Sequence, residues 1–181
     1  MKNNGPYKIK SSEIKYKNPW IEVREDKVIH PKGKDGIFGV VKMLSGVSIL
    51  AIDDKDYVYL TNGFHYAIED SSIEVVSGAI DKNEKPIEAA KRELMEELGI
   101  EAKNWTDLGL VNPFTTTIHS CAHLFLARNL KFGKSNQTDM ENIELVKVKF
   151  EKAVEMVMKS QITHGPSCVL ILKAKEFLDN K

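Results

Sequence analysis

Apolar and polar residues alternate over the first part of the chain in the way expected of β-strands. The segment 21–30 largely follows a period of two, which is the pattern of a half-buried strand, and the segment 31–36 that follows has the composition of a turn. Turn residues at Ser45-Gly46 and at 53–56 separate further β-rich segments. These segments predict strands at 37–43, 47–52, 58–61 and 72–76. We therefore expect a meander of antiparallel hairpins.

The clearest helical pattern covers Pro86 to Leu98. Its apolar stripe consists of Ile87, Ala90, Leu94 and Leu98. Pro86 suits the first turn of a helix, and Gly99 suits the left-handed residue that follows the last turn. Lys85 stands at the N-cap position, where a Ser, Thr or Asp would normally accept the free amide hydrogens. The pattern predicts a helix with a well-defined end and a weaker beginning.

The remainder of the chain mixes strand and helix patterns. Strands are predicted at 106–111, 120–127 and 143–150, and helices at 151–159 and 167–178. The fold class is therefore α+β, with a mixed β-sheet between helices and an N-terminal antiparallel strand extension. We assign residues 1–43 to the extension and residues 44–181 to the main domain.

Composition narrows the class of protein. Hydrophobic residues make up 42% and charged residues 29% of the 181 positions, which is the balance of a globular chain. Twenty-six basic residues balance twenty-six acidic ones, so we expect neither nucleic acid nor a membrane as a partner. The longest apolar run, 168–172, is too short to span a bilayer, and the N-terminus has no apolar core of a signal peptide. Two cysteines fit a reducing compartment, so we expect a cytoplasmic protein.

Acidic residues are concentrated in and just before the predicted helix. Glu93 and Glu97 lie four residues apart and project from one face, beside the apolar stripe. Glu96 lies one step further round, and Glu84 lies in the loop that enters the helix. The segment 81–101 holds seven acidic and four basic residues, and carboxylates this close repel one another. A hard divalent cation with oxygen ligands is the usual compensation, and Mg²⁺ fits best.

The spacing of these residues forms a complete motif. Five residues separate Gly78 from Glu84, and seven more precede Arg92-Glu93; the run then continues Leu-Met-Glu-Glu-Leu-Gly-Ile to residue 100. The sequence resembles the Nudix hydrolase family, whose signature is G, five residues, E, seven residues, REU, one residue, EE, one residue, GU, with U aliphatic. Seven fixed residues at roughly 5 to 7% usage match by chance on the order of 10⁻⁹ to 10⁻⁸ times per window. This favours catalysis over a solvated helix face in which the glutamates pair with Arg92 and Lys91.

The resemblance implies a Nudix fold and a role for each signature residue. The implied metal ligands are Glu93, Glu97, the main-chain carbonyl of Ser77, and Glu96, which is an additional ligand or a proton acceptor. Arg92 is implied to pair with Glu84 and to hold the loop and helix in shape. Magnesium, with manganese as a substitute, would neutralise diphosphate charge, position a water for in-line attack and lower the pKa of that water.

Segments outside the signature resemble one branch of the family, the ADP-ribose pyrophosphatases and related nucleoside diphosphate sugar hydrolases. These segments are Asn18-Pro-Trp20, Asn62–Ala67, Asn112-Pro113, His123–Leu130 and Asp139–Glu144. The branch implies cleavage of the diphosphate bond of a nucleoside diphosphate sugar, with ADP-ribose giving AMP and ribose 5-phosphate as the favoured reaction. It also implies a homodimer whose interface includes residues 1–43.

Catalytic and substrate-binding candidates follow from the same resemblance. Glu141, on an acidic loop, is expected to orient or deprotonate the attacking water; the alternatives are that it lies in a plain surface loop, or that the nearby Glu144 or Glu96 is the base. The expected substrate-binding residues are Trp20, Arg24, His65 and Pro113. Trp20 either stacks on adenine or caps the core.

Two departures from the branch widen the range of substrates. His65 stands where family members often have an arginine for the diphosphate, and a neutral imidazole binds phosphate more weakly. The segment 114–119 replaces a Gly-Phe-Ser-Asp-Glu-like loop. The alternative substrates are GDP-mannose, a dinucleoside polyphosphate or capped RNA. A sensor that binds ADP-ribose without cleaving it is the non-catalytic alternative, against which the intact glutamate set and the lack of a helix-turn-helix pattern argue.

Overall fold

The computed structural model describes residues 2–135 and 143–180 of the chain, and Glu141 therefore lies outside the described residues. The chain divides into two units, which we describe one at a time. The first unit extends to Leu44 and also includes Asn112–Cys121. The second unit comprises Ser45–Val111 and the chain from Ala122 onward.

The first unit is a β-sheet. Its strands are β1 (Lys2–Asn4), β2 (Tyr7–Lys17), β3 (Ile21–Ile29), β4 (Asp35–Met43) and β9 (Ile118–His119), in the order β1-β2-β3-β4-β9. The first four strands are antiparallel, as the sequence predicted for the N-terminal extension, and β9 pairs with β4 in parallel. The carbonyl of Thr117 also accepts the N–H of Val41 at 2.9 Å. A segment 77 residues further along the chain, counted from Val41 to Ile118, thus completes this sheet.

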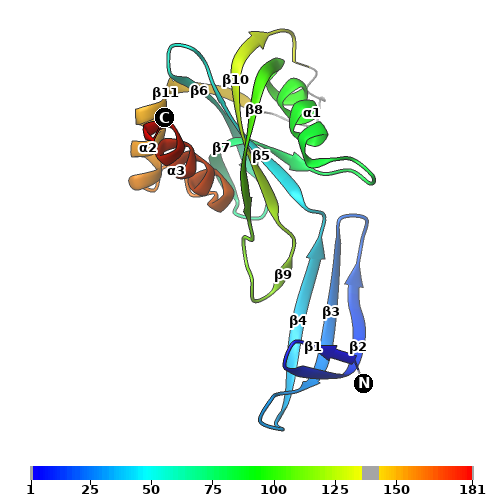
Figure 1. Ribbon diagram of the computed structural model, residues 1–181. Coiled ribbons are helices and arrows are strands. Elements are labelled where there is room, and N and C mark those ends of the chain that lie inside the picture. Colours follow the sequence, from blue (N-terminus) through cyan, green and yellow to red (C-terminus); the bar gives the residue numbers. More distant parts are fainter. Residues whose placement is uncertain (1, 136–142, 181) are drawn as a thin grey trace. The chain divides into compact units, whose positions relative to one another are not determined.

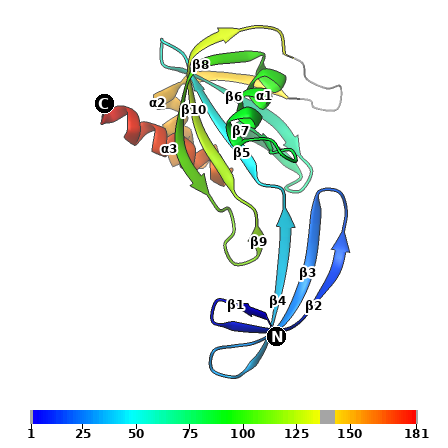
Figure 2. The same ribbon diagram turned by 45° about the vertical axis from the view of Figure 1, so that its right-hand side comes forward.

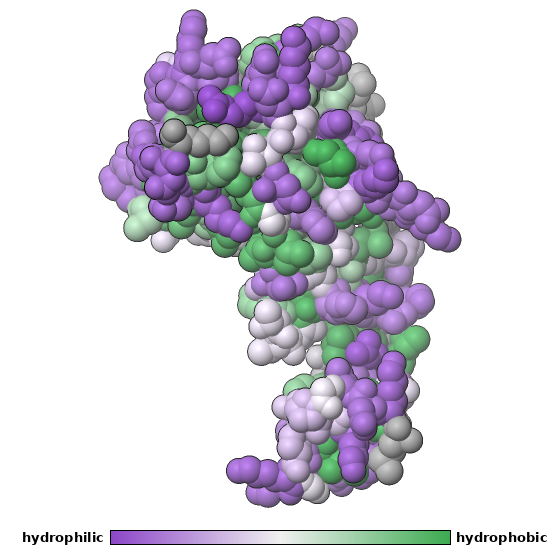
Figure 3. Space-filling model, in the orientation of Figure 1, coloured by the Kyte–Doolittle hydropathy of each residue, from purple (hydrophilic) through white to green (hydrophobic). Residues whose placement is uncertain are grey.

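Apolar side chains of the first unit are largely exposed. Ile14, Trp20 and Ile37 are between 55 and 72% exposed, and Figure 3 shows hydrophobic atoms interspersed with hydrophilic ones on the visible face of this sheet. A sheet ordinarily becomes stable by burying one apolar face against another layer. The described elements of this unit are strands alone, so its apolar side chains have little cover within the unit.

The second unit is a mixed sheet with helices on both faces. The strands are β5 (Gly46–Ile52), β6 (Tyr57–His65), β7 (Asp70–Ala79), β8 (Ile100–Val111), β10 (Ala122–Phe132) and β11 (Glu144–Lys149). Their order is β11-β6-β7-β5-β10-β8, with β5 and β10 parallel and the other pairs antiparallel. Helix α1 (Pro86–Leu98) covers one face, and α2 (Phe150–Met158) and α3 (Gly165–Asp179) cover the other (Figures 1 and 2). The predicted α+β fold is confirmed.

Alternating residues of the central strand β5 feed two separate cores. Leu50 and Ile52 pack into the core under α2 and α3, while Ile49 and Ala51 pack into the core under α1. Burial on both faces explains why β5 is apolar except for Ser48 and does not alternate with polar residues. Among the described residues, we find no helix with the length and apolar character needed to cross a membrane.

Helix α1 has the bounds that its sequence pattern predicted. Its first turn lacks a side-chain cap from Lys85, but the carboxylate of Glu88 accepts the main-chain N–H of Lys85 at 3.3 Å, which is half of a capping box. At its other end, Gly99 is left-handed with φ of 63°, and its N–H donates to the carbonyl of Met95 at 2.9 Å. The chain then enters β8 directly at Ile100, six residues earlier than predicted.

We expect Gly99→Ala to destabilise the second unit. A Cβ at residue 99 would lie 2.6 Å from the amide nitrogen of Ser135 and 2.9 Å from the carbonyl of Gly133, and the positive φ disfavours any side chain. Chemical denaturation should show a loss of at least about 1 kcal/mol in the free energy of unfolding. Gly39→Ala is the matched control, because a Cβ there meets nothing within 4 Å. Equal stabilities of the two variants would contradict the expectation.

Candidate active site at the start of helix α1

Two glycines allow the backbone to approach closely where β7 leads toward α1. A Cβ at Gly78 would overlap the carboxyl group of Glu93, so this carboxylate lies directly against the strand backbone. On the neighbouring strand, a Cβ at Gly46 would lie 2.9 Å from the carbonyl oxygen of Gly78. The sequence context predicted a turn at Gly46, but this residue is instead the first of β5. The signature helix and two strands therefore meet at one point with no side chain between them.

The strand that precedes this point is fixed by a pair of hydroxyl groups, one from the buried Ser48 and one from the half-buried Ser77. The hydroxyl of Ser77 donates to the carbonyl of Val75 at 3.1 Å. It therefore accepts from the hydroxyl of Ser48, whose oxygen lies 3.0 Å away on β5. Ser48 was not a sequence-based candidate, and a serine in an apolar strand gave no signal of this role.

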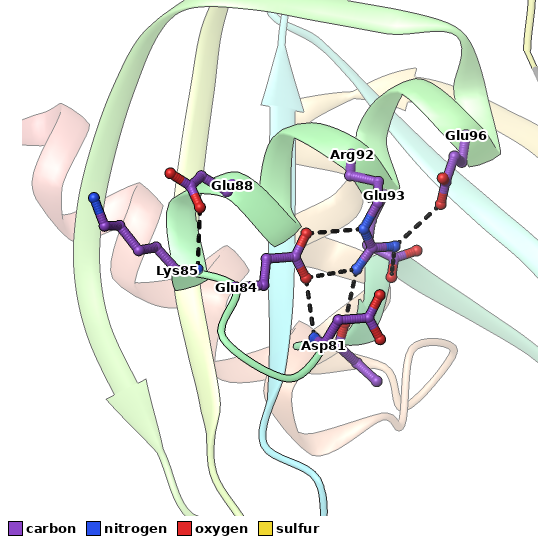
Figure 4. Close-up of polar contacts among 8 residues, drawn as sticks. Asp81, Glu84, Lys85, Glu88, Arg92, Glu93 and Glu96 are labelled. Atoms are coloured by element: carbon purple, nitrogen blue, oxygen red, sulfur yellow. Dashed lines mark hydrogen bonds and ion pairs between the residues drawn. The ribbon is translucent and has the colours of Figure 1, made fainter.

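The guanidinium of Arg92 joins the end of β7, the following loop and α1 (Figure 4). Its Nε and Nη2 donate to the two oxygens of Glu84 at 2.9 and 3.0 Å, which is a two-pronged ion pair. Nη2 also donates to the carbonyl of Ala79 at 3.0 Å, and the amide of Asp81 donates to Glu84 at 3.0 Å. The structure thus brings together Arg92 and Glu84, the pair expected from the sequence.

The remaining nitrogen of Arg92 faces the helix carboxylates. Nη1 lies 2.7 Å from an oxygen of Glu93 and 3.1 Å from an oxygen of Glu96. These contacts, chiefly the one with Glu84, raise the pKa of Arg92, while Arg92 and the Asp81 amide lower the pKa of Glu84. Arg92 and Glu84 are consequently both charged near neutral pH.

The three helix glutamates differ in their exposure to solvent. Glu97 is 8% exposed and Glu93 has a side chain that is 14% exposed, whereas the Glu96 side chain is 46% exposed. This agrees with the expected place of Glu93 and Glu97 at the edge of the core. No three His, Cys, Asp or Glu side chains in the described ranges converge in a metal-ligating arrangement. Glu93, Glu96 and Glu97 nevertheless offer carboxylate oxygens from positions i, i+3 and i+4 of one helix, and such donors fit a hard divalent cation.

The predicted substrate-binding residues fall in both units. Trp20, Arg24 and Pro113 belong to the first unit, and His65 belongs to the second. Trp20 is 72% exposed, which does not agree with the alternative that it caps the core. His65 lies at the end of β6, where its Nε2 is 3.2 Å from an oxygen of Glu74.

Arg24 lies in a cavity of the first unit. The cavity has a volume of about 320 Å³ and is lined by Asn4, Tyr7, Ile9, Arg24, Asp26, Val28, Phe38, Val40 and Thr115–His119. Arg24 Nε lies 3.1 Å from the buried carboxylate of Asp26, which also accepts from the hydroxyl of Ser12 at 2.5 Å. The guanidinium of Arg24 is therefore held in place by Asp26 where it lines the cavity, and it is not a freely moving surface side chain.

Glu144, the alternative base, begins β11. Because side chains alternate along a strand, it shares the face of Val146 and Val148, which pack with the core under α2 and α3. The opposite face of the sheet carries α1. Glu144 consequently points away from the face of the sheet on which the signature glutamates lie.

The fold and the signature loop and helix define a class of hydrolase that acts on phosphorus-containing anhydrides. A family model described as NUDIX domain matches residues 42–165, and one described as Nucleoside diphosphate sugar hydrolase N-terminal domain matches residues 7–41. The NUDIX match covers more than half of the chain, so this chain belongs to the Nudix family. Together, the two matches confirm the predicted resemblance to the ADP-ribose pyrophosphatase branch.

Individual relatives agree with this placement. The chain is 28% identical to an ADP-ribose pyrophosphatase from Bacillus subtilis (strain 168) over 162 residues, covering 87% of this chain and 88% of the relative. It is 24% identical to a methanol dehydrogenase activator from Bacillus methanolicus over 180 residues, covering 96 and 95%. The crystal structure of an ADP compounds hydrolase superimposes with a TM-score of 0.85 at 18% identity, covering 99 and 98% of the chains, which shows a shared fold.

We expect Gly78→Ala to lower activity without unfolding the protein. The added methyl group would displace the carboxylate of Glu93, the mobile end of a flexible side chain, so the free energy of unfolding should change by less than about 1 kcal/mol. Moving a catalytic carboxylate by an ångström lowers turnover on the order of 100-fold. Denaturation and steady-state kinetics measured on the same preparation test this, with Gly39→Ala as the control. Loss of stability in proportion to activity would oppose this view of Gly78.

We expect Arg92→Lys to loosen the loop before α1. A lysine is a single point charge and cannot form the two-pronged contact with Glu84, so Glu84 would hold the Asp81 amide less firmly. Hydrogen exchange at the Asp81 amide should accelerate, and kcat/KM should fall about tenfold or more. Arg128→Lys, on β10, serves as the control substitution. Unchanged hydrogen exchange at the Asp81 amide would show that the two-pronged ion pair between Arg92 and Glu84 does not organise the loop.

Proposed function

We propose that this chain hydrolyses the diphosphate bond of a nucleoside diphosphate sugar, with ADP-ribose giving AMP and ribose 5-phosphate as the favoured reaction. The observation that carries the proposal is the cluster in which Arg92 joins Glu84, Glu93 and Glu96 at a point where Gly78 leaves no side chain in the way. The nucleoside diphosphate sugar hydrolase model over residues 7–41 and the Bacillus subtilis relative support the choice of substrate.

The proposed cofactor is Mg²⁺, with Mn²⁺ as a substitute. Glu93 and Glu97, with Glu96 and the main-chain carbonyl of Ser77, would hold it, because they offer only hard oxygen donors. When bound, the ion supplies charge neutralisation for the diphosphate and acidifies a water molecule. Arg92 holds Glu93 and Glu96 on one side, so the carboxylates keep a net negative charge that suits a dication.

Proton transfer from the attacking water is assigned to Glu141. The alternation along β11 supports this choice over Glu144, which points away from the α1 face of the sheet. Glu96 is the remaining alternative, because it is the most exposed of the three helix glutamates.

A homodimer is proposed for the first unit. Its strands expose Ile14 and Ile37, and a sheet with such a surface gains stability when a second layer covers it. Trp20, as an exposed aromatic ring, is proposed to stack on the adenine base, and Arg24 and Pro113 to contact the nucleotide. His65 is a fourth proposed contact.

The decisive experiment identifies products from a panel of nucleotide sugars, and compares the chain with Glu97→Gln. With ADP-ribose and Mg²⁺ we expect AMP and ribose 5-phosphate, and we expect Glu97→Gln to lower kcat on the order of 1000-fold. Titration with Mn²⁺ followed by electron paramagnetic resonance should show weaker ion binding in the same variant. Glu101→Gln is the control, since Glu101 is exposed and pairs with Lys131 at the surface.

Other outcomes would select the alternatives. Preferred cleavage of GDP-mannose, a dinucleoside polyphosphate or capped RNA would replace the substrate while keeping the site. Binding of ADP-ribose without any cleavage would favour a sensor. Full activity of Glu97→Gln would overturn the assignment of the site itself.

A further inference from the structure

A cluster of polar side chains outside the Nudix signature joins the β6–β7 hairpin to the start of α3. At its centre is Glu74 of β7, whose side chain is only 13% exposed. One oxygen of Glu74 lies 3.2 Å from Nε2 of His65, and the other lies 3.0 Å from Nδ1 of His164. Placing a carboxylate in so dry a position costs free energy unless its partners compensate, and packing alone does not require it.

The His164 end of the cluster is fixed to the sheet by a fully buried serine. The hydroxyl oxygen of Ser167, in the first turn of α3, accepts the N–H of Val75 at 3.0 Å and lies 2.8 Å from Nδ1 of His164. The main-chain N–H of Val75 is free to bind Ser167 because β5 pairs with β7 only from Val76 to Ala79, which leaves an opening between the two strands beyond Val76. The start of α3 occupies the gap where the two strands separate, and it holds His164 against Glu74.

The close contacts of Glu74 with the two imidazole rings favour one proton arrangement. Desolvation opposes the charge on Glu74, but the contacts with His164, followed by those with Ser72 and His65, outweigh it and hold the pKa of Glu74 below its usual value. An ionised carboxylate only accepts hydrogen bonds, so each ring nitrogen that faces Glu74 carries a proton. The neutral form of His65 is therefore the Nε2–H tautomer. Its Nδ1 is then a hydrogen-bond acceptor on a ring that is 46% exposed.

Glu74 and His65 lie on the same face of the sheet as α1 but away from the signature. Thr61 pairs with Glu74 and His65 with Asp70, and Glu74 shares its face of β7 with Gly78. Four residues of extended strand, roughly 13 Å, separate Glu74 from Gly78, and Asp70, the partner of His65, lies beyond Glu74. A diphosphate whose reacting phosphorus lies at Glu93 would not reach His65. With the phosphorus held there, a contact with His65 would fall to a part of the substrate beyond the diphosphate.

We propose that Glu74 and His164 are positioning residues that hold His65 as the Nε2–H tautomer, so that its Nδ1 accepts a hydrogen bond from a sugar hydroxyl of the substrate. This rests on the proposed nucleotide-sugar hydrolase function. It also assigns a use to the departure from arginine at this position. A guanidinium only donates hydrogen bonds and suits a phosphate, whereas a neutral imidazole can accept one from a hydroxyl.

The first test measures the tautomers without substrate or metal. The protein is labelled with ¹⁵N-histidine and long-range ¹H–¹⁵N spectra are recorded under conditions in which both rings are neutral; His65→Asn and His164→Asn assign the signals. We expect His65 as Nε2–H and His164 as Nδ1–H, and we expect Glu74→Gln to give a mixture of forms for at least one ring. His65 as Nδ1–H in the unsubstituted chain, or identical spectra in Glu74→Gln, would overturn the proposal.

The second test separates binding from turnover. For ADP-ribose, Glu74→Gln, His164→Asn and His65→Asn should each raise KM about tenfold, the size of one hydrogen bond, with kcat changed less than about twofold. The double variant His65→Asn, Glu74→Gln should be no worse than His65→Asn alone, because Glu74 acts through His65. Glu155→Gln is the matched control, since this carboxylate also lies between two nitrogen-bearing side chains, those of Lys152 and Lys159.

A third measurement identifies the sugar contact. ADP-ribose analogues in which single ribose hydroxyls are replaced by hydrogen should include one whose KM is higher for the unsubstituted chain and unchanged in His65→Asn. Additive effects in the double variant, or an unchanged KM in Glu74→Gln with the fold intact by circular dichroism, would overturn the role of Glu74. If no nucleotide sugar is hydrolysed, the proposed function and the sugar contact both fail, whereas the tautomer spectra still report on the positioning network by itself.

Discussion

The contact between Arg92 and Glu84 is the interaction on which the active-site region depends. One guanidinium binds a loop carboxylate with two nitrogens, the carbonyl that ends β7, and two carboxylates of its own helix. A strand end, a loop and a helix are held together by a group that is always charged. The same charge reduces the repulsion among the helix glutamates without cancelling it, so the loop and helix keep their shape while the site remains negative overall.

A steric condition accompanies this electrostatic one. Gly78 must lack a side chain because the carboxylate of Glu93 lies against it. Gly46 must lack one because the carbonyl oxygen of Gly78 lies against it in turn. Close pairing of β5 with β7 at these glycines ends at Val76, after which the strands separate and the start of α3 enters. The same strand pairing therefore has two consequences. It brings the signature helix close to β7 at Gly78, and where it ends it leaves room for the start of α3, which carries His164.

Local signals account for what the sequence predicted well. Pro86, the apolar stripe and Gly99 define α1 to the residue, because each acts within one or two helical turns. The spacing of the glutamates identified the family for the same reason. Contacts between distant residues were not predictable in this way: the bond from Val75 to Ser167 joins positions 92 apart, and the pairing of β9 with β4 returns a late segment to the N-terminal sheet. No residue pattern close to Glu74 indicated that two histidines would meet it.

The division between shared and particular residues follows from these two kinds of signal. The signature is common to a family whose members act on different substrates, so the groups that distinguish substrates must lie outside it. The proposed recognition groups are held by polar contacts: Arg24 by Asp26 of its own strand, which also binds Ser12 of β2, and His65 by Glu74 of β7. Each couples a candidate recognition group to a buried carboxylate, whose partners set its direction and charge. The helix glutamates, which we propose for the chemical step, are aligned by a single helix and one arginine. Selection of the substrate therefore depends more strongly on tertiary packing than the chemical step does.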